Sequence, residues 1–383
     1  MKIAMISEDT GPLVAGLSAA LGRQGHYVTV YTRRDSPAQR ERVRLAPGVT
    51  VEHVPAGPPE RIPRQELLPW THDFGRQLER RWAADPPDVA HAHFWMSGLA
   101  AIQAAQAAGA RRVPVVQTFH DLGVVSRRHQ VGNTGPASRV RLERAIGHAV
   151  DAVIATCSEE VAELAAMGVA HDRVRVVPCG VDLDLFAPGG PPEDGRRLVV
   201  LSRLVERKGV DTAIRALAKV PDAELAIAGG PRGDLDADPN VRALREVARN
   251  AGVAARVTFL GRLDRDEVPP LLRSAGLVVT LPWYEPFGMV PLEAMACGVP
   301  VVASAVGGHL DTVVHGVTGL HVPPLDPDSA AAAIRALLDD PARRAAMGTA
   351  GADRARDHYS WTRVATDVAA VYRHAAALTE LAA

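Results

Sequence analysis

The chain has 383 residues, and at roughly 150–200 residues per domain this length predicts two domains of similar size. Hydrophobic residues make up 47% of the chain and charged residues 23%, so there is enough apolar material for buried cores, and global disorder is excluded. With 43 basic against 44 acidic side chains, the sequence lacks the strong positive field of a nucleic-acid-binding protein.

The cysteines and the apolar runs indicate the compartment. Cys157, Cys179 and Cys297 are odd in number and widely spaced, which fits neither a disulfide framework nor a metal-binding knuckle. Residues 1–10 lack the apolar core of a signal peptide, and no run approaches the roughly eighteen apolar residues of a membrane-spanning helix. We therefore expect a cytoplasmic protein without an integral membrane segment.

The first half alternates strand-like and helical patterns. It opens with a buried strand at 2–7, a turn-rich stretch, a helix at 13–24 and a second strand at 27–31. Further strands are expected at 49–54, 89–92, 113–118, 152–155 and 174–177. Strands that alternate with helices predict an α/β domain with a parallel, doubly wound sheet.

A segment rich in proline, glycine and charge, residues 186–197 (FAPGGPPEDGRR), interrupts this pattern and predicts a domain boundary. We therefore expect a first domain at 1–187, a second at 188–360, and a C-terminal helix in 361–383 that packs back onto the first domain. Helical spacing of the apolar residues Val364, Val368 and Val371 predicts that last helix.

The second half repeats the same architecture, with strands expected at 198–202, 223–228, 256–260, 277–281 and 299–303. Two doubly wound domains that face each other would bring the carboxyl ends of both sheets to a shared cleft, where such folds bind ligands. The fold alone equally permits a dehydrogenase, an epimerase, a phosphorylase or a sugar-binding sensor.

The segment 284–298 (YEPFGMVPLEAMACG) directly follows the strand expected at 277–281. Gly288 permits a close backbone approach. A helix that begins near Met289 or Val290 would direct unpaired N–H groups at the cleft, and a helix N-terminus of this kind binds anions.

Two glutamates flank the start of that predicted helix. Glu285 lies just before it and Glu293 about one turn into it, so the two carboxylates would reach different parts of one ligand. Two carboxylates and an anion site suit the sugar hydroxyls, diphosphate and ribose of a nucleotide sugar. The alternative is a capped helix with solvent-exposed glutamates.

A second segment, 201–209 (LSRLVERKG), comes off the first strand of the second domain. Arg203 leaves the strand at its carboxyl end, and Lys208, one of only three lysines in the chain, precedes Gly209. The guanidinium and the ammonium together would stabilise a departing diphosphate. A solvated basic turn is the alternative, and it is the interpretation we favour for Arg207.

These segments resemble the retaining glycosyltransferases of family 4, which have the GT-B fold of two facing Rossmann-like domains. The Glu-x7-Glu element is the specific signature; weaker matches lie at 177–182 (VPCGVD), 228–231 (AGGP) and 257–261 (VTFLG). In the first half, the branch that includes mycothiol and sucrose-phosphate synthesis has acceptor-side segments similar to 90–94 (AHAHF), 117–123 (QTFHDLG) and 139–143 (RVRLE). The resemblance covers essentially the whole chain.

The resemblance implies roles on the donor side, in the second domain. Arg203 and Lys208 would bind the diphosphate, Glu285 the transferred sugar and Glu293 the ribose, and the backbone of Arg262 would meet the base. The remaining donor contacts that it implies are Gly230, Phe287, Gly288, Met289 and Val290.

On the first domain, His120 matches the family's histidine near the reacting sugar. Its position after the strand at 113–118 also allows it to face the cleft, although a lone histidine is more often a packing residue. His91 and His93 share one face of a strand, but no third ligand is apparent, and we predict no metal site. Acceptor contacts are expected at Asp9, Gly11, Asp121 and Arg139; for Arg139, an ordinary surface ion pair with Glu143, four residues on, is the alternative.

Two departures from the family pattern are visible. The loop after the first strand, residues 7–16 (SEDTGPLVAG), lacks the usual paired glycines; Gly11 is a candidate substitute, but Pro12 beside it removes a donor N–H. This puts the first domain's share of donor binding in question. Cys179 stands where the family often has Asn, which we interpret as a packing change.

The resulting hypothesis is a retaining hexosyltransferase that uses a nucleoside diphosphate sugar, with UDP favoured, and a small polar acceptor such as a cyclitol, aminocyclitol or saccharide. Arg203, Lys208, Glu285 and His120 are its catalytic candidates, and the scheme requires no metal ion or cofactor. The alternatives are a sugar phosphorylase, a nucleotide-sugar epimerase, or a non-catalytic nucleotide-sugar-binding subunit. The sequence leaves the oligomeric state open.

Overall fold

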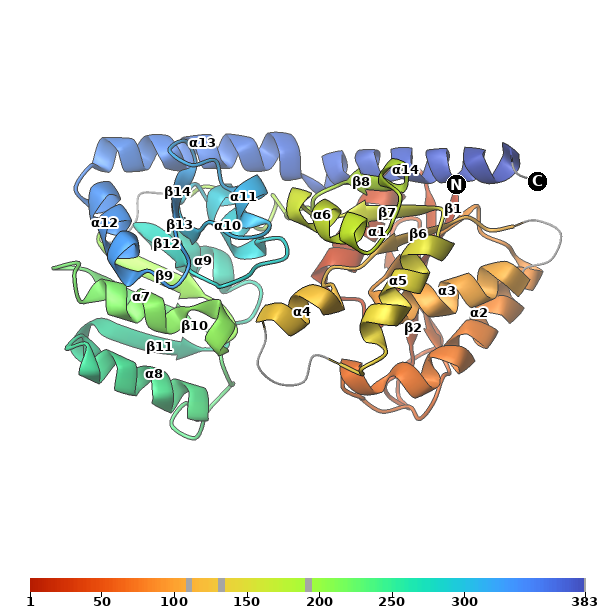
Figure 1. Ribbon diagram of the computed structural model, residues 1–383, viewed down its shortest axis with the longest axis horizontal. Helices are drawn as coiled ribbons and strands as arrows, with labels where there is room; N and C mark the ends of the chain where they lie inside the picture. Colours follow the sequence, from red (N-terminus) through yellow and green to blue (C-terminus); the bar gives the residue numbers. More distant parts are fainter. Residues whose placement is uncertain (108–111, 130–134, 190–194, 382–383) are drawn as a thin grey trace. The chain divides into compact units, whose positions relative to one another are not determined.

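The computed structural model describes residues 1–107, 112–129, 135–189 and 195–381 (Figure 1). It divides the chain into two units, one of Met1–Gly180 with the segment that begins at Trp361, the other of Val181–Ser360. The unit boundary therefore precedes the expected one after Ala187. The physical reason is that Val181 donates its N–H to Tyr359 O over 2.8 Å and pairs with Ser360, which ties residues 181–187 to the second unit. Part of the expected linker, residues 190–194, lies outside the described residues.

The described strands of the first unit form one eight-stranded sheet in the order β3-β4-β2-β1-β5-β6-β7-β8. All pairs are parallel except β3 with β4. The strands are β1 (Lys2–Ile6), β2 (Tyr27–Arg33), β3 (Arg42–Ala46), β4 (Val49–Val54), β5 (Val89–His93), β6 (Val115–Thr118), β7 (Ala152–Ala155) and β8 (Val174–Val176). The helices are α1 (Pro12–Arg23), α2 (Thr71–Ala84), α3 (Trp95–Ala107), α4 (Gly123–His129), α5 (Arg139–Ala149), α6 (Ser158–Ala166) and α14 (Trp361–Leu381).

The C-terminal helix α14 packs on this first sheet, along α1 (Figure 1). Val364, Val368 and Val371 are buried, and Tyr372 is completely enclosed in the same core as Ile3 and Met5 of β1. The apolar stripe of α14 thus covers one face of the sheet. Parallel sheets are generally buried by helices on both faces.

The described strands of the second unit form a six-stranded parallel sheet in the order β11-β10-β9-β12-β13-β14. They are β9 (Arg197–Leu201), β10 (Glu224–Ala228), β11 (Val257–Gly261), β12 (Leu277–Thr280), β13 (Val301–Ser304) and β14 (Gly319–Val322). The helices are α7 (Val210–Leu217), α8 (Pro239–Asn250), α9 (Val268–Arg273), α10 (Met289–Ala296), α11 (His309–Thr312), α12 (Pro327–Leu338) and α13 (Pro341–Tyr359). The prediction of two doubly wound α/β domains is confirmed.

Two strands are absent from the sequence-based expectations. β3 (RVRLA) is an edge strand of five residues, in which only Val43 and Leu45 alternate with arginines, and Arg42–Leu45 are all exposed. An alternation this short is a weak strand signal. β14 has only four residues and begins with a glycine, which weakens the strand signal. No helix within the described parts of the chain is both long and apolar enough to cross a membrane.

Candidate functional site

The turn that holds Lys208 lies at the carboxyl end of the second sheet. A single 3-10 turn, Glu206–Lys208, follows β9 and ends at Gly209, which has φ +62°. A Cβ atom at Gly209 would lie 1.9 Å from the carbonyl oxygen of Leu281, just after β12. Only glycine permits this approach, which sets Lys208 beside the loop that follows β12.

Lys208 and Glu285 form an ion pair, with the ammonium donating to Oε2, and each side chain is only 16% exposed. Burial raises the pKa of Glu285, but Lys208 and, to a smaller extent, His309 outweigh it, so the pKa lies below its ordinary value. Burial lowers the pKa of Lys208, and Glu285 opposes that effect. Lys208, which we expect to bind the diphosphate, and Glu285, which we expect to bind the sugar, therefore lie side by side.

Arg207 is not the solvated residue expected from the sequence. It is half-buried, its Nη1 donates to the carbonyl oxygen of Tyr284 over 3.2 Å, and its own carbonyl accepts from the N–H of Trp283 over 2.8 Å. Arg207 thus connects the turn that holds Lys208 to the start of the loop that holds Glu285. Of these two consecutive residues, Arg207 bonds the loop backbone and Lys208 pairs with the Glu285 carboxylate.

Two consecutive glycines that the sequence analysis did not single out, Gly307 and Gly308, contact the backbone of Glu285. Gly308 donates its N–H to the carbonyl oxygen of Glu285 over 2.9 Å, and a Cβ atom at Gly307 would lie 2.0 Å from that oxygen. The available signal was the Gly-Gly pair shortly after β13, because paired glycines between a strand and a helix mark a close backbone contact.

Helix α10 begins at Met289, after Gly288 with φ +92°. No described side chain caps its N-terminus. Pro291 has no N–H, so the N–H groups of Met289 and Val290 are the exposed donors of the first turn. The helix start carries partial positive charge close to the Lys208–Glu285 pair and is suited to an anion.

Glu293 lies one turn into α10 and is 3% exposed, so the alternative of a solvent-exposed glutamate is wrong for this residue. Its Oε1 accepts a hydrogen bond from Nη1 of Arg265 over 2.5 Å, and burial raises its pKa. The guanidinium of Arg265 also lies over the ring of Phe186, 4.5 Å from its centroid. Nothing in the local sequence marks Arg265 as a site residue, because its partner Glu293 lies in another segment.

The other donor-side candidates surround the ends of β9, β10 and β11. Arg203 is exposed, and its guanidinium forms no hydrogen bond or ion pair among the described residues, which leaves its charge available to a ligand. Gly230 has φ +91°. Arg262 donates its N–H to Pro231 O over 3.1 Å, so this donor is already satisfied, and its side chain is exposed.

In the first unit, His120 follows β6 and adopts φ +60°, a strained conformation for a residue with a Cβ. Its Nε2 lies 2.8 Å from Nδ1 of His93, and its ring centroid lies 4.8 Å from that of Phe94. Burial lowers the pKa of His120 to about 4, and nearby Arg64 acts in the same direction. His120 is therefore neutral near pH 7.

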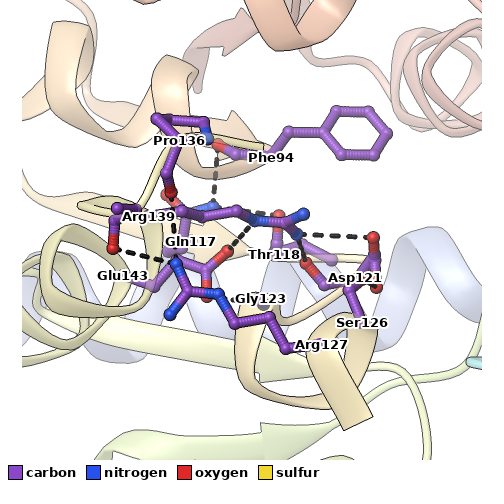
Figure 2. Close-up of polar contacts among 11 residues, drawn as sticks. Phe94, Gln117, Thr118, Asp121, Gly123, Ser126, Arg127, Pro136, Arg139 and Glu143 are labelled. Atoms are coloured by element: carbon purple, nitrogen blue, oxygen red, sulfur yellow. Dashed lines mark hydrogen bonds and ion pairs between the residues drawn. The ribbon is translucent and has the colours of Figure 1, made fainter. Parts of the chain in front are cut away.

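Asp121 and Arg139, both expected to bind acceptor, interact with each other (Figure 2). Nη2 of Arg139 donates to Asp121 O over 2.5 Å, and its Nε donates to Glu143 Oε1 over 2.7 Å. Glu143 is fully buried and also accepts the N–H of Gly123 over 2.7 Å. The alternative of an ordinary surface ion pair is thus wrong, because this pair is buried and fixes the start of α4.

Asp9 and Gly11 form a turn before α1. Oδ1 of Asp9 accepts the N–H of Gly11 over 2.9 Å, and Oδ2 accepts from Arg64 over 3.3 Å. Pro12 is the first residue of α1 and has no N–H to donate. The N–H of Gly11 is already bonded to Asp9. Cys179 is buried, and burial raises the pKa of its thiol.

Comparison with known proteins identifies the family of the chain. A family model described as "Glycosyltransferase Family 4" matches residues 12–185, and one described as "Glycosyl transferases group 1" matches residues 183–354. D-inositol 3-phosphate glycosyltransferase 1 of Catenulispora acidiphila is 36% identical, covering 98% of this chain and 96% of that protein. The corresponding enzyme of Kribbella flavida is 35% identical over 98% of this chain and 96% of its own.

Among solved structures, sucrose-phosphate synthase from Thermosynechococcus elongatus superposes with a TM-score of 0.87 at 30% identity, covering 98% of both chains. Anabaena HepE, in a structure with UDP and glucose, has the same fold with a TM-score of 0.75 at 22% identity, covering 97% of this chain and 98% of its own. Fold and sequence together define an enzyme, a glycosyltransferase with the GT-B fold. The chain belongs to glycosyltransferase family 4. Within that family, it is similar to the inositol phosphate glycosyltransferases and to sucrose-phosphate synthase.

Proposed function

We propose that the protein is a retaining glycosyltransferase that moves a hexose from a UDP-sugar to a hydroxyl of a small polar acceptor, such as a cyclitol, aminocyclitol or saccharide. The observation that carries the proposal is the buried Lys208–Glu285 pair beside the N-terminus of α10. Taking two charges out of water is costly, so such a pair is retained where both charges have a further task.

The donor fits this arrangement group by group. Glu285 accepts hydrogen bonds from sugar hydroxyls, while Lys208, the free guanidinium of Arg203 and the N–H groups of Met289 and Val290 hold the diphosphate. Glu293 accepts from the ribose hydroxyls when Arg265 shifts or shares it. Negative charge grows on the diphosphate as the glycosyl bond breaks, and these groups are already oriented toward it.

We propose that substitution occurs on one face of the sugar. The leaving phosphate oxygen takes the proton of the acceptor hydroxyl while the acceptor oxygen bonds to the anomeric carbon, so the configuration is retained. The donor thus supplies the base, and the protein supplies charge and orientation. His120, neutral and held in place, contacts the sugar as a hydrogen-bonding group.

The acceptor class rests on the relatives. The curated relatives at 35–36% identity carry names that specify D-inositol 3-phosphate, a small phosphorylated cyclitol. The name of the sucrose-phosphate synthase at 30% identity indicates a sugar phosphate product. Both support a small polyol acceptor. We also place the protein in the cytoplasm, since the buried thiols of Cys157, Cys179 and Cys297 form no disulfide bond among the described residues.

The test is a panel of UDP-, GDP- and ADP-hexoses with and without cyclitol and saccharide acceptors. Transfer should require an acceptor, and NMR of the product from an α-linked donor should show an α linkage. Altered sugar without acceptor would indicate an epimerase, and phosphate-dependent cleavage of the glycoside a phosphorylase. A β-linked product would contradict retention.

Two substitutions locate the chemistry. Lys208→Ala and Glu285→Gln should each lower kcat/KM by about 10²–10³, the loss typical of one transition-state charge contact. Lys219→Ala and Glu246→Gln are matched controls, because each removes the charge of an exposed surface pair. If neither Lys208→Ala nor Glu285→Gln lowers turnover relative to these controls, the catalytic assignment fails.

A further inference from the structure

His93, on β5 in the first unit, has a partner at each ring nitrogen. Its side chain is buried, its Nδ1 lies 2.8 Å from Nε2 of His120, and its Nε2 lies 2.8 Å from Sδ of Met5 on β1. The centroids of the His93 and His120 rings lie 5.1 Å apart, and their planes differ by only 16°. The three residues therefore form one chain, Met5–His93–His120.

The thioether at one end of this chain decides where the protons lie. A thioether sulfur has no hydrogen to donate and accepts only weakly, so the nitrogen facing it carries the proton. Burial lowers the pKa of His93 well below its ordinary value, and the neighbouring His91 and His120 add to the effect. A neutral imidazole has one donor and one acceptor. Nε2–H of His93 thus faces Met5, and its Nδ1 accepts from His120.

The opposite arrangement is disfavoured. If Nδ1 of His93 donated to His120, the bare Nε2 of His93 would face the sulfur of Met5 lone pair to lone pair at 2.8 Å. In the favoured arrangement Nε2 of His120 carries the proton, which leaves the lone pair on its Nδ1. Within the described residues that nitrogen has no hydrogen-bond partner.

We propose that His93, held by Met5, is a positioning residue that fixes the tautomer of His120, so that Nδ1 of His120 is presented as a hydrogen-bond acceptor to one hydroxyl of the transferred sugar. The inference rests on the proposed function for the placement of His120 at the sugar. It adds a specificity: the donor must offer a hydroxyl that donates at that point, and a donor lacking it should react more slowly.

The tautomer is measured directly by nitrogen-15 NMR of the histidine rings, with His120 assigned from the spectrum of His120→Gln. We expect His120 to be protonated at Nε2 and bare at Nδ1 near pH 7. Met5→Leu keeps the core volume and removes the acceptor that orients His93, so it should populate the other His120 tautomer. A proton on Nδ1 of His120 in the unmodified protein would overturn the proposal, with or without a folded variant.

Tyr372→Phe is the matched control. The hydroxyl of Tyr372 lies 2.7 Å from Nδ1 of His91, and the centroid of the His91 ring lies 4.2 Å from that of His93, with the two planes tilted by 38°. Among the described residues, Tyr372 itself has no hydrogen bond to Met5, His93 or His120. This change removes one hydroxyl from the same core and should leave the tautomer of His120 unaltered. A change as large as that in Met5→Leu would show general loosening of the core instead.

The functional readout uses UDP-hexoses that each lack one hydroxyl. For one of them kcat/KM should fall about tenfold, the loss expected of one hydrogen bond to a buried group. That discrimination should shrink in Met5→Leu, while the losses with the other deoxy donors stay the same. If Met5→Leu discriminates against that deoxy donor as strongly as the unmodified protein does, the proposed donor specificity is overturned. If the tautomer is as stated but the protein transfers no UDP-sugar, the proposed function fails instead.

Discussion

Removing the charge of Lys208 should destabilise the second unit, because its ion-pair partner Glu285 is left buried without a counter-charge. Lys208→Met keeps most of the aliphatic stem but leaves Glu285 buried without its ammonium. Breaking a buried ion pair from one side costs about 3–5 kcal/mol. Because both side chains retain 16% exposure, we expect the lower end, about 3 kcal/mol. Adding Glu285→Gln removes the stranded charge, so the double variant should recover about 2 kcal/mol of that loss.

The pH dependence of stability should also change sign. In the unmodified protein the pKa of Glu285 lies below its ordinary value of 4.5, so its stabilisation is present above pH 4.5 and is lost as the pH falls further. Without Lys208, burial should raise the pKa of Glu285 above 4.5. The variant should then gain stability at this group as the pH falls from neutrality through the raised pKa.

Native-state hydrogen exchange of peptides from β12 measures this stability locally, without assuming that both units unfold together. Lys219→Met is the control, because its pair with Asp328 is exposed and should contribute no more than about 1 kcal/mol. If Lys208→Met costs no more than Lys219→Met at pH 7, or if it leaves the pH dependence unchanged, the reasoning about a stranded carboxylate is refuted.

Two further predictions concern the loops at the sheet ends. Burial raises the pKa of Glu8 to about 7, so the folded chain binds a proton between pH 4.5 and 7 that the unfolded chain lacks. Stability should fall as the pH rises through this range and level off above it, and calorimetry should show a flatter profile for Glu8→Gln but not for the exposed control Glu66→Gln. Gly209→Ala would bring a Cβ within 1.9 Å of Leu281 O, so UDP affinity by titration calorimetry should fall at least about tenfold. Gly233→Ala, which shares the positive φ but has nothing within 4 Å of the added Cβ, should retain affinity; equal losses would implicate backbone strain alone.

Much of the fold follows from local patterns. Alternating strand and helix signals predicted two doubly wound sheets, and the start of α10 near Met289 followed from Gly288 and the apolar run after it. Strands β3 and β14 escaped detection, because they are only five and four residues long, and each contains too few apolar residues for its alternation to stand out. The candidate donor residues could likewise be selected by sequence, since Arg203 and Lys208 follow a strand and suit a diphosphate, and the resemblance of the Glu-x7-Glu element implied the roles of Glu285 and Glu293.

What the sequence by itself determined was therefore which residue types stand at which strand ends. Tertiary structure alone decided their partners. Lys208 and Glu285 are 77 positions apart, and their pairing depends on the close contact between Gly209 and the chain after β12. Arg265 on Glu293 and the Met5–His93–His120 chain also join separate segments. Such contacts leave no periodic signal, because proximity across parallel strands is set by sheet order and not by spacing along the chain.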